Sequence, residues 1–466
     1  MTDRIATLRA EILAKTRELI QLREQPQPFV RGTTVVPYAG RVYDADEVEA
    51  GVDSMLDFWL TLGKHGDAFE KELAATLGVK GCVLTNSGSS ANLLAFAALT
   101  SYKLGERRLR PGDEVITVAA GFPTTVAPII QCGCVPVFID VNPITMGPRI
   151  DQLEDAFVAG KTKAVMIAHA LGNPFDLDEV LRFCRDKGLW LIEDNCDSLG
   201  STYGGRPTGT FGDLSTQSFY PPHHLTLGEG GAINIVRDAK LRLLVESFRD
   251  WGRDCWCPSG KDDTCRKRFD WQLGQLPKGY DHKYIYSHLG WNLKPLDPQA
   301  AIGRQQLKKL PRFSQARRDN WQTLRRGLAP LEDRLDFMLP THASGWSTDG
   351  FAWRPGKTHS DPSWFGFLML VKSGASLPRT SLARALDAAK IGNRMFFGGN
   401  LVRQPAFVQL QADSMGSAFR VIGDLSGSDR VMNESLFVGT YPGLMPEHLD
   451  HIIATITTAC GAAAGA

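Results

Sequence analysis

AVMIAHALGNPFDLDEVLRFCRDKGLWLIEDN, residues 164–195, is the stretch of this sequence that decides the fold. It begins and ends with an apolar run of strand type, and a helix is predicted between them from about Asp176 to Lys187. Two such strands joined by a helix form a parallel crossover unit. The second strand delivers Glu193 and Asp194 to its carboxyl end, where open α/β sheets bind their ligands.

Outside this unit the chain changes character along its length. Residues 4–24 carry an apolar helical face among Arg and Glu residues, and Pro26 and Pro28 end that pattern. From about residue 40 to 330, β-rich runs alternate with helical stretches, as an open, mainly parallel α/β sheet requires. We therefore expect a helical extension at 1–35, a large α/β domain at 36–330 and a smaller α+β domain at 331–466.

Composition argues against several classes of protein. The 466 residues include 52 basic and 51 acidic side chains, so the formal charge of +1 gives no long-range field that would attract nucleic acid or an anionic membrane. The uncharged run at 115–139 is interrupted by glycine and proline, which indicates buried strands and turns and not a membrane-spanning helix. The charged N-terminus lacks the apolar core of a signal peptide. We expect a soluble, cytoplasmic protein that binds neither nucleic acid nor membrane.

A phosphate-binding motif is predicted in GCVLTNSGSSANLLAFAAL, residues 81–99, where a short strand runs through Ser87, Gly88 and Ser89 into an apolar helix. The first N–H groups of a helix have no helical partner and the helix dipole is positive there. Glycine permits close approach and serine adds donors, so a phosphate fits at this helix start. A serine-capped helix after a tight turn is the alternative.

Two further motifs carry ionisable groups. In LIEDNCDSLG, residues 191–200, Asp194 can hold a ring nitrogen protonated, or it can be a helix-capping residue of the following loop. In SFYPPHHLTLGEGGAINIV, residues 218–236, His223 and His224 precede a glycine-rich turn between two strands. A histidine pair of this kind is more often structural than catalytic.

In this order the three motifs resemble the sugar aminotransferase family of pyridoxal-phosphate (PLP) enzymes, which have the aspartate aminotransferase fold, PLP-dependent fold type I. That family has a lysine at the position of His223, and histidine cannot make the covalent link to the cofactor that the lysine makes. The resemblance therefore implies a cofactor held without a covalent link, most usefully as pyridoxamine phosphate (PMP). An imidazole can still move a proton at the methylene carbon of that cofactor.

Nine cysteines, an odd total, favour free thiols or metal ligands over a disulfide framework. The segment RDCWCPSGKDDTC supplies Cys255, Cys257 and Cys265, and Cys196 lies two positions after Asp194. Four thiolates match the ligands of a 2Fe-2S cluster. Zinc is the alternative, although the C-x2-C spacing of the usual zinc knuckles is absent. The other five cysteines are predicted to pack in the core: Cys82, Cys132, Cys134, Cys184 and Cys460.

Together these features resemble one branch of the family, the nucleotide-diphospho-4-keto-6-deoxyhexose 3-dehydrases, whose members act on CDP- or dTDP-linked sugars. The likeness runs from GVDSML at 51–56, through FRDWGRDCWC, to GGNLVRQPAF at 398–407. The main departure is the segment 341–360, which looks like an insertion in the small domain. The resemblance implies reductive removal of the C3 hydroxyl from a sugar such as dTDP-4-keto-2,6-dideoxyglucose or CDP-4-keto-6-deoxyglucose.

The resemblance also assigns roles to individual residues. Asp197 falls where the family usually has a glutamine near the hydroxyl of the cofactor ring. Asn292 corresponds to an asparagine that reaches the cofactor phosphate of the neighbouring subunit, which implies a homodimer. Arg403 is a candidate for the diphosphate of the substrate, with a surface ion pair as the alternative. The remaining roles are a stacking residue, a partner of the ring nitrogen and three phosphate ligands: Phe122; Asp194; Gly88, Ser89 and Ser218.

Two partners follow from this interpretation, a nucleotide-sugar substrate and a separate ferredoxin- or flavodoxin-type reductase. The chain has no GxGxxG fingerprint after a strand, so electrons would reach the cluster from another protein. A cluster-free 3-dehydrase or a sugar aminotransferase of the same fold is the enzymatic alternative. A non-catalytic scaffold stabilised by zinc is the alternative of another class.

Overall fold

The computed structural model describes residues 2–24, 28–258, 260–374 and 377–462. At its centre is an eight-stranded sheet in which every neighbouring pair is parallel except the two pairs made by β9. This arrangement confirms the predicted mainly parallel α/β sheet of the aspartate aminotransferase fold. In spatial order the strands are β1 (Gly81–Thr85), β9 (Gly231–Ile235), β8 (Leu214–Ser218), β5 (Trp190–Asp194), β4 (Thr162–Ala168), β2 (Glu114–Val118), β3 (Val135–Ile139) and β16 (Arg420–Val421).

The predicted crossover unit is present as β4, α7 (Leu177–Lys187) and β5. β4 and β5 pair in parallel, with Ala168 opposite Asp194 at their carboxyl ends. Asp176 caps α7 by accepting a hydrogen bond from the backbone N–H of Glu179, and Gly188 ends the helix in the left-handed conformation. The capping residues therefore set the length of the helix, and the helix returns the chain to the start of β5.

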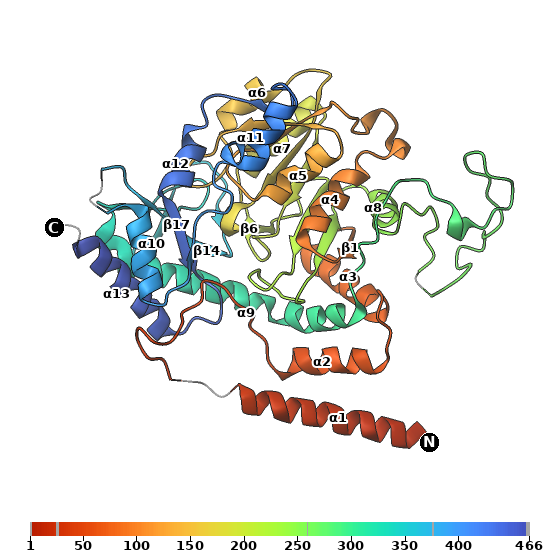
Figure 1. Cartoon of the computed structure of the whole chain (residues 1–466), viewed down its shortest axis with the longest axis horizontal. Coiled ribbons are helices and arrows are strands. Elements are labelled where there is room, and N and C mark those ends of the chain that lie inside the picture. Colours follow the sequence, from red (N-terminus) through yellow and green to blue (C-terminus); the bar gives the residue numbers. More distant parts are fainter. Residues whose placement is uncertain (1, 25–27, 259, 375–376, 463–466) are drawn as a thin grey trace.

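Helices cover both faces of the sheet, and a long helix crosses beneath it (Figure 1). One apolar cluster joins the sheet to α4, α5 and α8, and another joins its opposite face to α7 and the C-terminal sheet. The helix α9 contacts α2 and α3 at one end and α13 and β14 at the other. The helices not yet given bounds in this part are α2 (Ala45–Leu56), α3 (Lys64–Leu77), α4 (Gly88–Ala98), α5 (Pro123–Gln131), α6 (Leu153–Ala156), α8 (Leu241–Arg249) and α9 (Asp297–Leu328).

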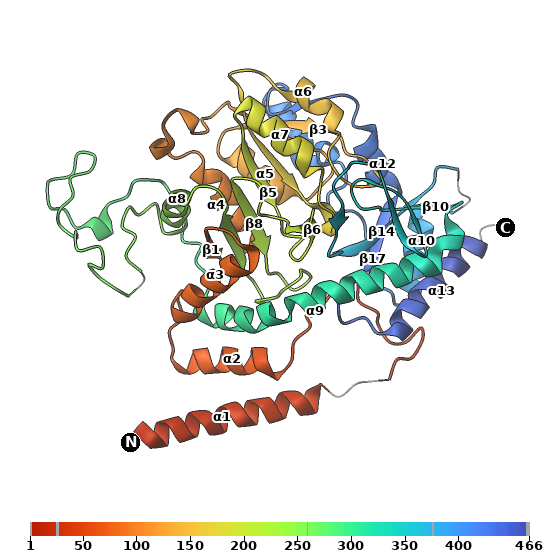
Figure 2. The ribbon, with the colours of Figure 1, turned by 180° about the vertical axis from the view of Figure 1, so that it is seen from behind.

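The predicted N-terminal helix is present as α1 (Thr2–Arg23), which lies beside α2 at the edge of the molecule (Figures 1 and 2). Arg9 on α1 forms ion pairs with Asp53 and Asp57. The apolar side chains that define its helical face are solvent-exposed, among them Ile5 and Leu22. Pro26, one of the two prolines predicted to end the helix, lies outside the described residues.

The C-terminal part contains a four-stranded antiparallel sheet with helices packed on it. Its strands, in spatial order, are β10 (Leu335–Phe337), β14 (Gly366–Val371), β17 (Ser435–Gly439) and β15 (Asn393–Arg394). Its helices are α10 (Arg379–Ala388), α11 (Pro405–Asp413), α12 (Ser426–Glu434) and α13 (Pro446–Ala462). The segment 341–360 folds as the hairpin β11 (Ala343–Ser347) and β12 (Gly350–Trp353), and the next strand joins a small sheet made of β13 (Ser360–Asp361), β6 (Thr202–Tyr203) and β7 (Arg206–Pro207).

The division of the chain at residues 35 and 330 stays a prediction, because several elements connect the parts. β16 leaves the C-terminal region and pairs with β3 of the central sheet. Val36 forms a parallel bridge with Ile391. α9 packs against elements of both regions. Within the described residues, no helix combines the length and apolar character needed to cross a bilayer.

Glu193 joins the carboxyl end of β5 to the turn before β8. Its carboxylate is fully buried and accepts hydrogen bonds from the backbone N–H groups of Gly209, Phe211 and Gly212, at 2.9, 2.7 and 2.6 Å. His169 Nε2 lies 3.0 Å from Glu193 Oε2. Burial alone would raise the pKa of Glu193, but His169 and these backbone donors hold it below its usual value. One side chain therefore satisfies three buried backbone donors.

We expect Glu193→Ala to lower the free energy of unfolding by about 3–5 kcal/mol, because the change leaves His169 and three buried N–H groups without their acceptor. Equilibrium urea unfolding measures this loss. Glu106→Ala is the matched control, since the Glu106 side chain is 94% exposed and its removal should change stability by less than about 0.5 kcal/mol. Equal effects of the two substitutions would contradict the assigned role of Glu193.

Candidate active site

A cleft of about 460 Å³ lies between the carboxyl ends of the central strands and the C-terminal region. The central sheet and its loops form one wall, and aromatic residues near β15 and β17, including Phe397 and Phe437, form the other. Eight of the predicted site residues line this cleft: Gly88, Ser89, Phe122, Asp194, Cys196, Asp197, Ser218 and His223. The structure therefore brings together most of the site expected from the sequence.

One end of the cleft is built from the start of α4 and the end of β8. Ser87 caps α4 by accepting a hydrogen bond from the backbone N–H of Ser90 at 3.1 Å. A Cβ at Gly88 would lie 2.5 Å from the Cβ of Ser218, so only glycine allows this close approach. Helix N–H groups and two serine hydroxyls, from Ser89 and Ser218, thus gather at one point, as a phosphate site requires.

Asp194 lies in the floor of the cleft at the end of β5, where it is 5% exposed. Its Oδ2 accepts hydrogen bonds from Asn92 Nδ2 at 2.8 Å and from Thr125 Oγ1 at 2.6 Å. Its Oδ1 accepts one from the backbone N–H of Cys196 at 3.2 Å. Thr216 supports Asn92 by donating to Asn92 Oδ1 at 2.7 Å. The carboxylate is therefore held in one orientation as an acceptor, which suits a protonated ring nitrogen.

His223 and Asp197 face each other in the cleft, with His223 Nδ1 3.5 Å from Asp197 Oδ1. Burial lowers the pKa of His223 to about 4. Burial, together with the nearby Asp194, raises the pKa of Asp197 to about 7. Arg317, fully buried on α9, donates to the carbonyl oxygens of Pro222 and His223 at 3.4 and 3.1 Å. A neutral imidazole at neutral pH is ready to accept a proton, so His223 is competent as a general base.

His224 has a different environment. Its Nε2 lies 2.7 Å from the carbonyl oxygen of Ser363, it is 2% exposed, and burial holds its pKa well below the usual value. It does not belong to the residues that line the cleft. The two adjacent histidines are therefore separated by geometry, one facing the cleft and the other tied to the backbone before β14.

The four candidate metal-binding cysteines occupy two places. Cys255, Cys257 and Cys265 lie on the excursion between α8 and α9, where the Cys257 thiol interacts electrostatically with the thiols of both others. The Cys196 thiol lines the cleft, 4.0 Å from Thr216 Oγ1, and its charged neighbours are Asp194 and Asp197. A single chain thus brings three of the four thiols together. The five cysteines predicted to pack elsewhere are buried or partly buried: Cys82, Cys132, Cys134, Cys184 and Cys460.

Asn292 and Arg403 lie outside the residues that line the cleft. Asn292 is exposed and forms a backbone bridge with Asp250. Arg403 is half-exposed and pairs with Asp429, Nη2 to Oδ2 at 2.9 Å, as the alternative interpretation of this residue expects. Arg394 lines the cleft instead, with its guanidinium 4.2 Å from the ring centre of Tyr38. The roles of Asn292 and Arg403 stay predictions.

Sequence reasoning missed the residues that orient the others. Asn92 lies one helical turn after Gly88, and Thr125 lies three residues after Phe122. This spacing from a predicted site residue was the only signal that could have indicated their contact with the site. Arg317 comes from a helix more than 90 residues downstream of His223, and no local pattern marks it. The aromatic wall opposite the sheet was also missed.

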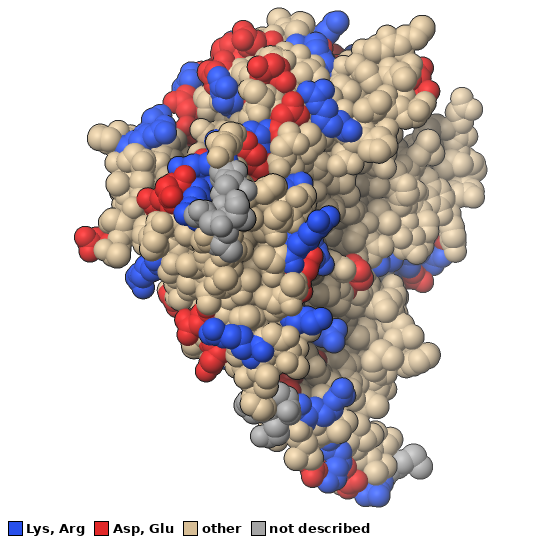
Figure 3. Space-filling view, turned by 60° about the vertical axis from the view of Figure 1, so that its left-hand side comes forward, with Lys and Arg blue, Asp and Glu red and all other residues tan. Residues whose placement is uncertain are grey.

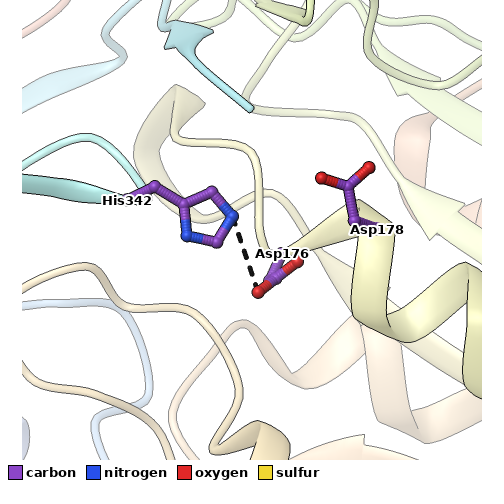
Figure 4. Close-up of side chains that lie close together, drawn as sticks. All are labelled: Asp176, Asp178 and His342. Carbon is purple, nitrogen blue, oxygen red and sulfur yellow. Dashed lines mark ion pairs between the residues drawn. The ribbon is translucent and has the colours of Figure 1, made fainter. Parts of the chain in front are cut away.

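A second group of ligand-type side chains lies away from the cleft. Asp176, Asp178 and His342 have ligand atoms within 4.8 Å of one another, and among the described residues this is the one such group (Figure 4). Figure 4 shows His342 directed at Asp176, at 3.5 Å. Asp178 Oδ2 already accepts from Tyr203 Oη at 2.9 Å and from Thr358 Oγ1 at 2.6 Å. These hydrogen bonds connect α7 to β6 and to the segment 341–360.

The surface charge agrees with the neutral composition. Figure 3 shows Lys and Arg side chains interspersed with Asp and Glu, and no large area of one sign covers this face. Such a face offers no basic track for a phosphate backbone.

A model of the DegT/DnrJ/EryC1/StrS aminotransferase family matches residues 42–457. The lipopolysaccharide biosynthesis protein RfbH of Salmonella typhimurium is 52% identical over 429 residues, 92% of each chain. The dTDP-4-dehydro-2,6-dideoxy-D-glucose 3-dehydratase of Saccharopolyspora spinosa is 46% identical over 455 residues, 98% of this chain and 93% of the relative.

Solved structures give the same result. An Escherichia coli GDP-4-keto-6-deoxy-D-mannose-3-dehydratase with bound hydrated PLP superposes with a TM-score of 0.75 at 28% identity, covering 90% of this chain and 99% of the other. A GDP-4-keto-6-deoxymannose-3-dehydratase with a trapped PLP-glutamate geminal diamine also has a TM-score of 0.75 at 28% identity, covering 90% and 100% of the two chains. The predicted fold and the predicted resemblance to sugar 3-dehydratases are thus confirmed.

The raised pKa of Asp197 gives a pH-dependent prediction. The folded protein keeps a proton on this carboxyl up to about pH 7, whereas an unfolded chain releases it near its reference pKa of about 3.9. The resulting stabilisation is complete below about pH 4 and is lost as the pH rises to about 7. Asp197→Asn removes this loss, so the variant should gain about 1–3 kcal/mol relative to the parent between about pH 5 and pH 8.

Urea unfolding of both proteins at the two pH values measures the difference, and comparison with the parent cancels the opposite contribution of His223. Asp155→Asn, at an exposed position, is the control and should show no pH-dependent gain. A constant difference between Asp197→Asn and the parent would contradict the raised pKa.

Proposed function

Because the chain belongs to the DegT/DnrJ/EryC1/StrS aminotransferase family, we propose that it is a nucleotide-diphospho-4-keto-6-deoxyhexose 3-dehydratase, which removes the C3 hydroxyl of its sugar in deoxysugar biosynthesis. The observation that carries this function is His223. It lines the cleft together with Asp194, and by the resemblance it takes the position of the aminotransferase lysine; no lysine is found among the described residues that line the cleft. The chain therefore has a base but no amine for covalent attachment of the cofactor.

The cleft fits PMP by its donor set and its shape. The start of α4, with Ser89 and Ser218, offers a phosphate site beside Gly88. A Cβ at Gly88 would fill the space there. Asp194 offers an acceptor for the ring nitrogen, and Phe122, half-exposed at the start of α5, offers a stacking face. Bound PMP supplies an amine for the C4 ketone of the sugar and a ring that accepts electrons as the C3–oxygen bond breaks.

The residues of this chain then have separate roles. His223 removes the proton from the C4′ carbon of the cofactor, since its neutral imidazole faces the cleft. Asp194, held by Asn92 and Thr125, keeps the ring nitrogen protonated. Asp197 lies near His223 and the predicted position of the ring hydroxyl, where its carboxyl can donate or accept a proton near neutral pH. The aromatic wall excludes water from the reacting atoms.

A 2Fe-2S cluster is the second cofactor of the proposal. Loss of water from C3 leaves the sugar two electrons and two protons short of the 3-deoxy product, so a reductant is needed. Cys196, Cys255, Cys257 and Cys265 supply the four thiolates, and a ferredoxin- or flavodoxin-type reductase supplies the electrons one at a time. A single zinc ion would need four thiolates about 3.8 Å apart, given Zn–S bonds of about 2.3 Å. Iron and sulfide analysis of the purified protein distinguishes the cluster from this zinc alternative.

The assembly we infer is a cytoplasmic homodimer with shared active sites. Asn292 is exposed and lies outside its own cleft, as expected if it binds the cofactor phosphate of the neighbouring subunit. The neighbouring residue Leu293 lies beside the predicted phosphate site of its own chain. Its carbonyl oxygen accepts hydrogen bonds from Asn86 N–H and Thr85 Oγ1, at 2.9 and 2.8 Å. The substrate is a CDP- or dTDP-linked sugar, and anaerobic turnover with each nucleotide sugar and a generic reductase identifies it.

Replacement of His223 tests the base. We expect His223→Asn to slow exchange of the C4′ hydrogen of bound PMP with solvent by ~10² to 10⁴, the usual contribution of a general base. Loss of deuterium from C4′-labelled PMP, followed by mass spectrometry, measures the rate. His224→Asn keeps a donor for the carbonyl of Ser363 and should retain much more of the exchange. Unchanged exchange in His223→Asn would refute the assignment.

A second variant tests the geometry independently of the chemistry. We expect His223→Lys to bind PLP covalently, seen as a mass increase after borohydride reduction, because the amine is restored where the family places it. The parent protein should show no such adduct. Absence of the adduct in a folded variant would show that His223 does not occupy the lysine position.

Replacement of one arm cysteine tests the cluster. We expect Cys257→Ser to lose iron and sulfide, and with them the electron paramagnetic resonance signal of the reduced protein, while PMP binding is largely kept. Cys132→Ser, outside the proposed ligand set, should retain its iron. Full iron occupancy in Cys257→Ser would refute the ligand assignment, and zinc without PMP in the parent protein would favour the scaffold alternative.

A further inference from the structure

The excursion between α8 and α9, residues 251–291, forms an arm that leaves the body of the protein (Figures 1 and 2). Its base is well anchored, since Asp254 pairs with Lys103 at 2.6 Å and with His282 Nε2 at 2.8 Å. Gly252 packs so tightly against the returning chain that a Cβ would lie 1.8 Å from the carbonyl oxygen of His288. The arm is therefore held by specific contacts at the point where it leaves the body.

The arm has a small core of its own near its cysteines. Trp271 stacks on His282 with ring centres 4.7 Å apart, and Trp256 packs edge-on against Trp271 at 5.7 Å. Trp256 lies between Cys255 and Cys257 in the sequence, so this aromatic contact fixes the segment that carries the thiols. The Cys257 thiol lies near enough to the thiols of Cys255 and Cys265 to interact electrostatically with both. Three ligands are thus already gathered before any metal is bound.

The fourth ligand is missing from the arm of the same chain. Of the other six cysteines, Cys196 is the one that lines the cleft, while the other five are packed elsewhere. Within the described residues the Cys196 thiol interacts with Asp194, Asp197 and Thr216, and none of these partners belongs to the arm. In Figure 2 the arm extends from the side of α8, whereas β5 and β6, which flank the segment of Cys196, lie in the middle of the molecule. One chain therefore holds three thiols in one place and the fourth in another.

The arm also exposes an unusual amount of apolar surface. Leu289 is 94% exposed, Tyr284 59% and Phe269 56%, and Trp256 and Tyr286 are exposed as well. Large exposed apolar patches of this kind mark interaction sites. A partner that covers this surface must also supply the fourth thiol beside Cys255, Cys257 and Cys265. Every copy of this chain offers one, at Cys196 in an open cleft.

We propose that the arm docks at the cleft of a second copy of this chain, so that Cys255, Cys257 and Cys265 of one protomer and Cys196 of the partner subunit bind one 2Fe-2S cluster. This inference rests on the cluster of the proposed function and adds its placement between subunits. A two-fold pair has two arms and two clefts, so it completes two identical sites without any further component. The ligand Cys196 lies two residues from Asp194, so each cluster would lie next to the cofactor site at which the sugar is reduced.

Mixed dimers test this placement. A Cys196→Ser chain and a Cys257→Ser chain are co-expressed with different affinity tags, and the heterodimer is isolated by sequential purification. In the proposed arrangement the intact arm of the first chain meets the intact Cys196 of the second. The heterodimer should therefore hold half the iron and sulfide of the wild-type dimer, while each variant homodimer holds essentially none.

The matched control pairs a wild-type chain with a chain carrying both substitutions. In the proposed arrangement neither site of this dimer is complete, so it should hold essentially no iron. If all four ligands came from one chain, the two results would be exchanged, because only the control dimer would keep a complete site. Half occupancy in the control, or a monomeric iron-containing protein, would overturn the proposal. Iron-free wild-type protein would instead refute the cluster itself.

Discussion

Two adjacent buried carboxylates at the end of β5 are the constraint on which the rest of this structure depends. Side chains alternate across a strand, so Glu193 and Asp194 enter opposite faces of the sheet. Buried carboxylates are costly unless they are hydrogen-bonded, and each therefore collects donors from several elements. Glu193 is hydrogen-bonded to the turn before β8 and to His169. Asp194 is hydrogen-bonded to α4, to α5 and to the loop that follows it. The hydrogen bonds of these two carboxylates thus hold together the elements that form the sheet side of the cleft.

The other ionisable groups in the cleft are less completely satisfied, and this difference marks the reactive part. His223 Nδ1 is buried and has no hydrogen-bond partner, while Asp197 is 3.5 Å away with a raised pKa. The Nη atoms of Arg317 donate to backbone carbonyl oxygens, so this side chain adds positive charge without forming an ion pair with another side chain. Groups with displaced pKa values that gather in a cleft are characteristic of catalytic sites.

Much of this arrangement could be predicted from the sequence because it depends on local signals. The crossover unit shows its strand, helix and capping residues in order, and the serine-rich helix start, the acidic strand end and the histidine pair follow strands that bring them to one edge. The helix-capping alternative for Asp194 does not apply, since its carboxylate binds Asn92 and Thr125. The alternative for the serines, a helix cap, is correct for Ser87. Ser89 is not explained by it, since Ser89 lines the cleft.

The remainder could not be predicted because it depends on contacts between distant segments. Arg317, the aromatic wall and the partners of Arg403 are brought to their places by α9 and the C-terminal region, and no spacing along the chain encodes those approaches. The difference between His223 and His224 is of the same kind. It is decided by the carbonyl oxygen of Ser363, which lies 139 positions later in the sequence.

The loop after β5 shows how closely the two proposed cofactors are coupled. Asp194, Cys196 and Asp197 lie within four residues, and all three line the cleft. The backbone N–H of Cys196 donates to the Asp194 carboxylate, so the residue that would bind a metal also fixes the residue that would bind the cofactor ring. A thiolate at Cys196 would be unfavourable without a metal, because burial and two neighbouring carboxylates raise the pKa of its thiol. A metal binds the thiolate form, so binding of a cluster would supply the free energy that deprotonates this thiol.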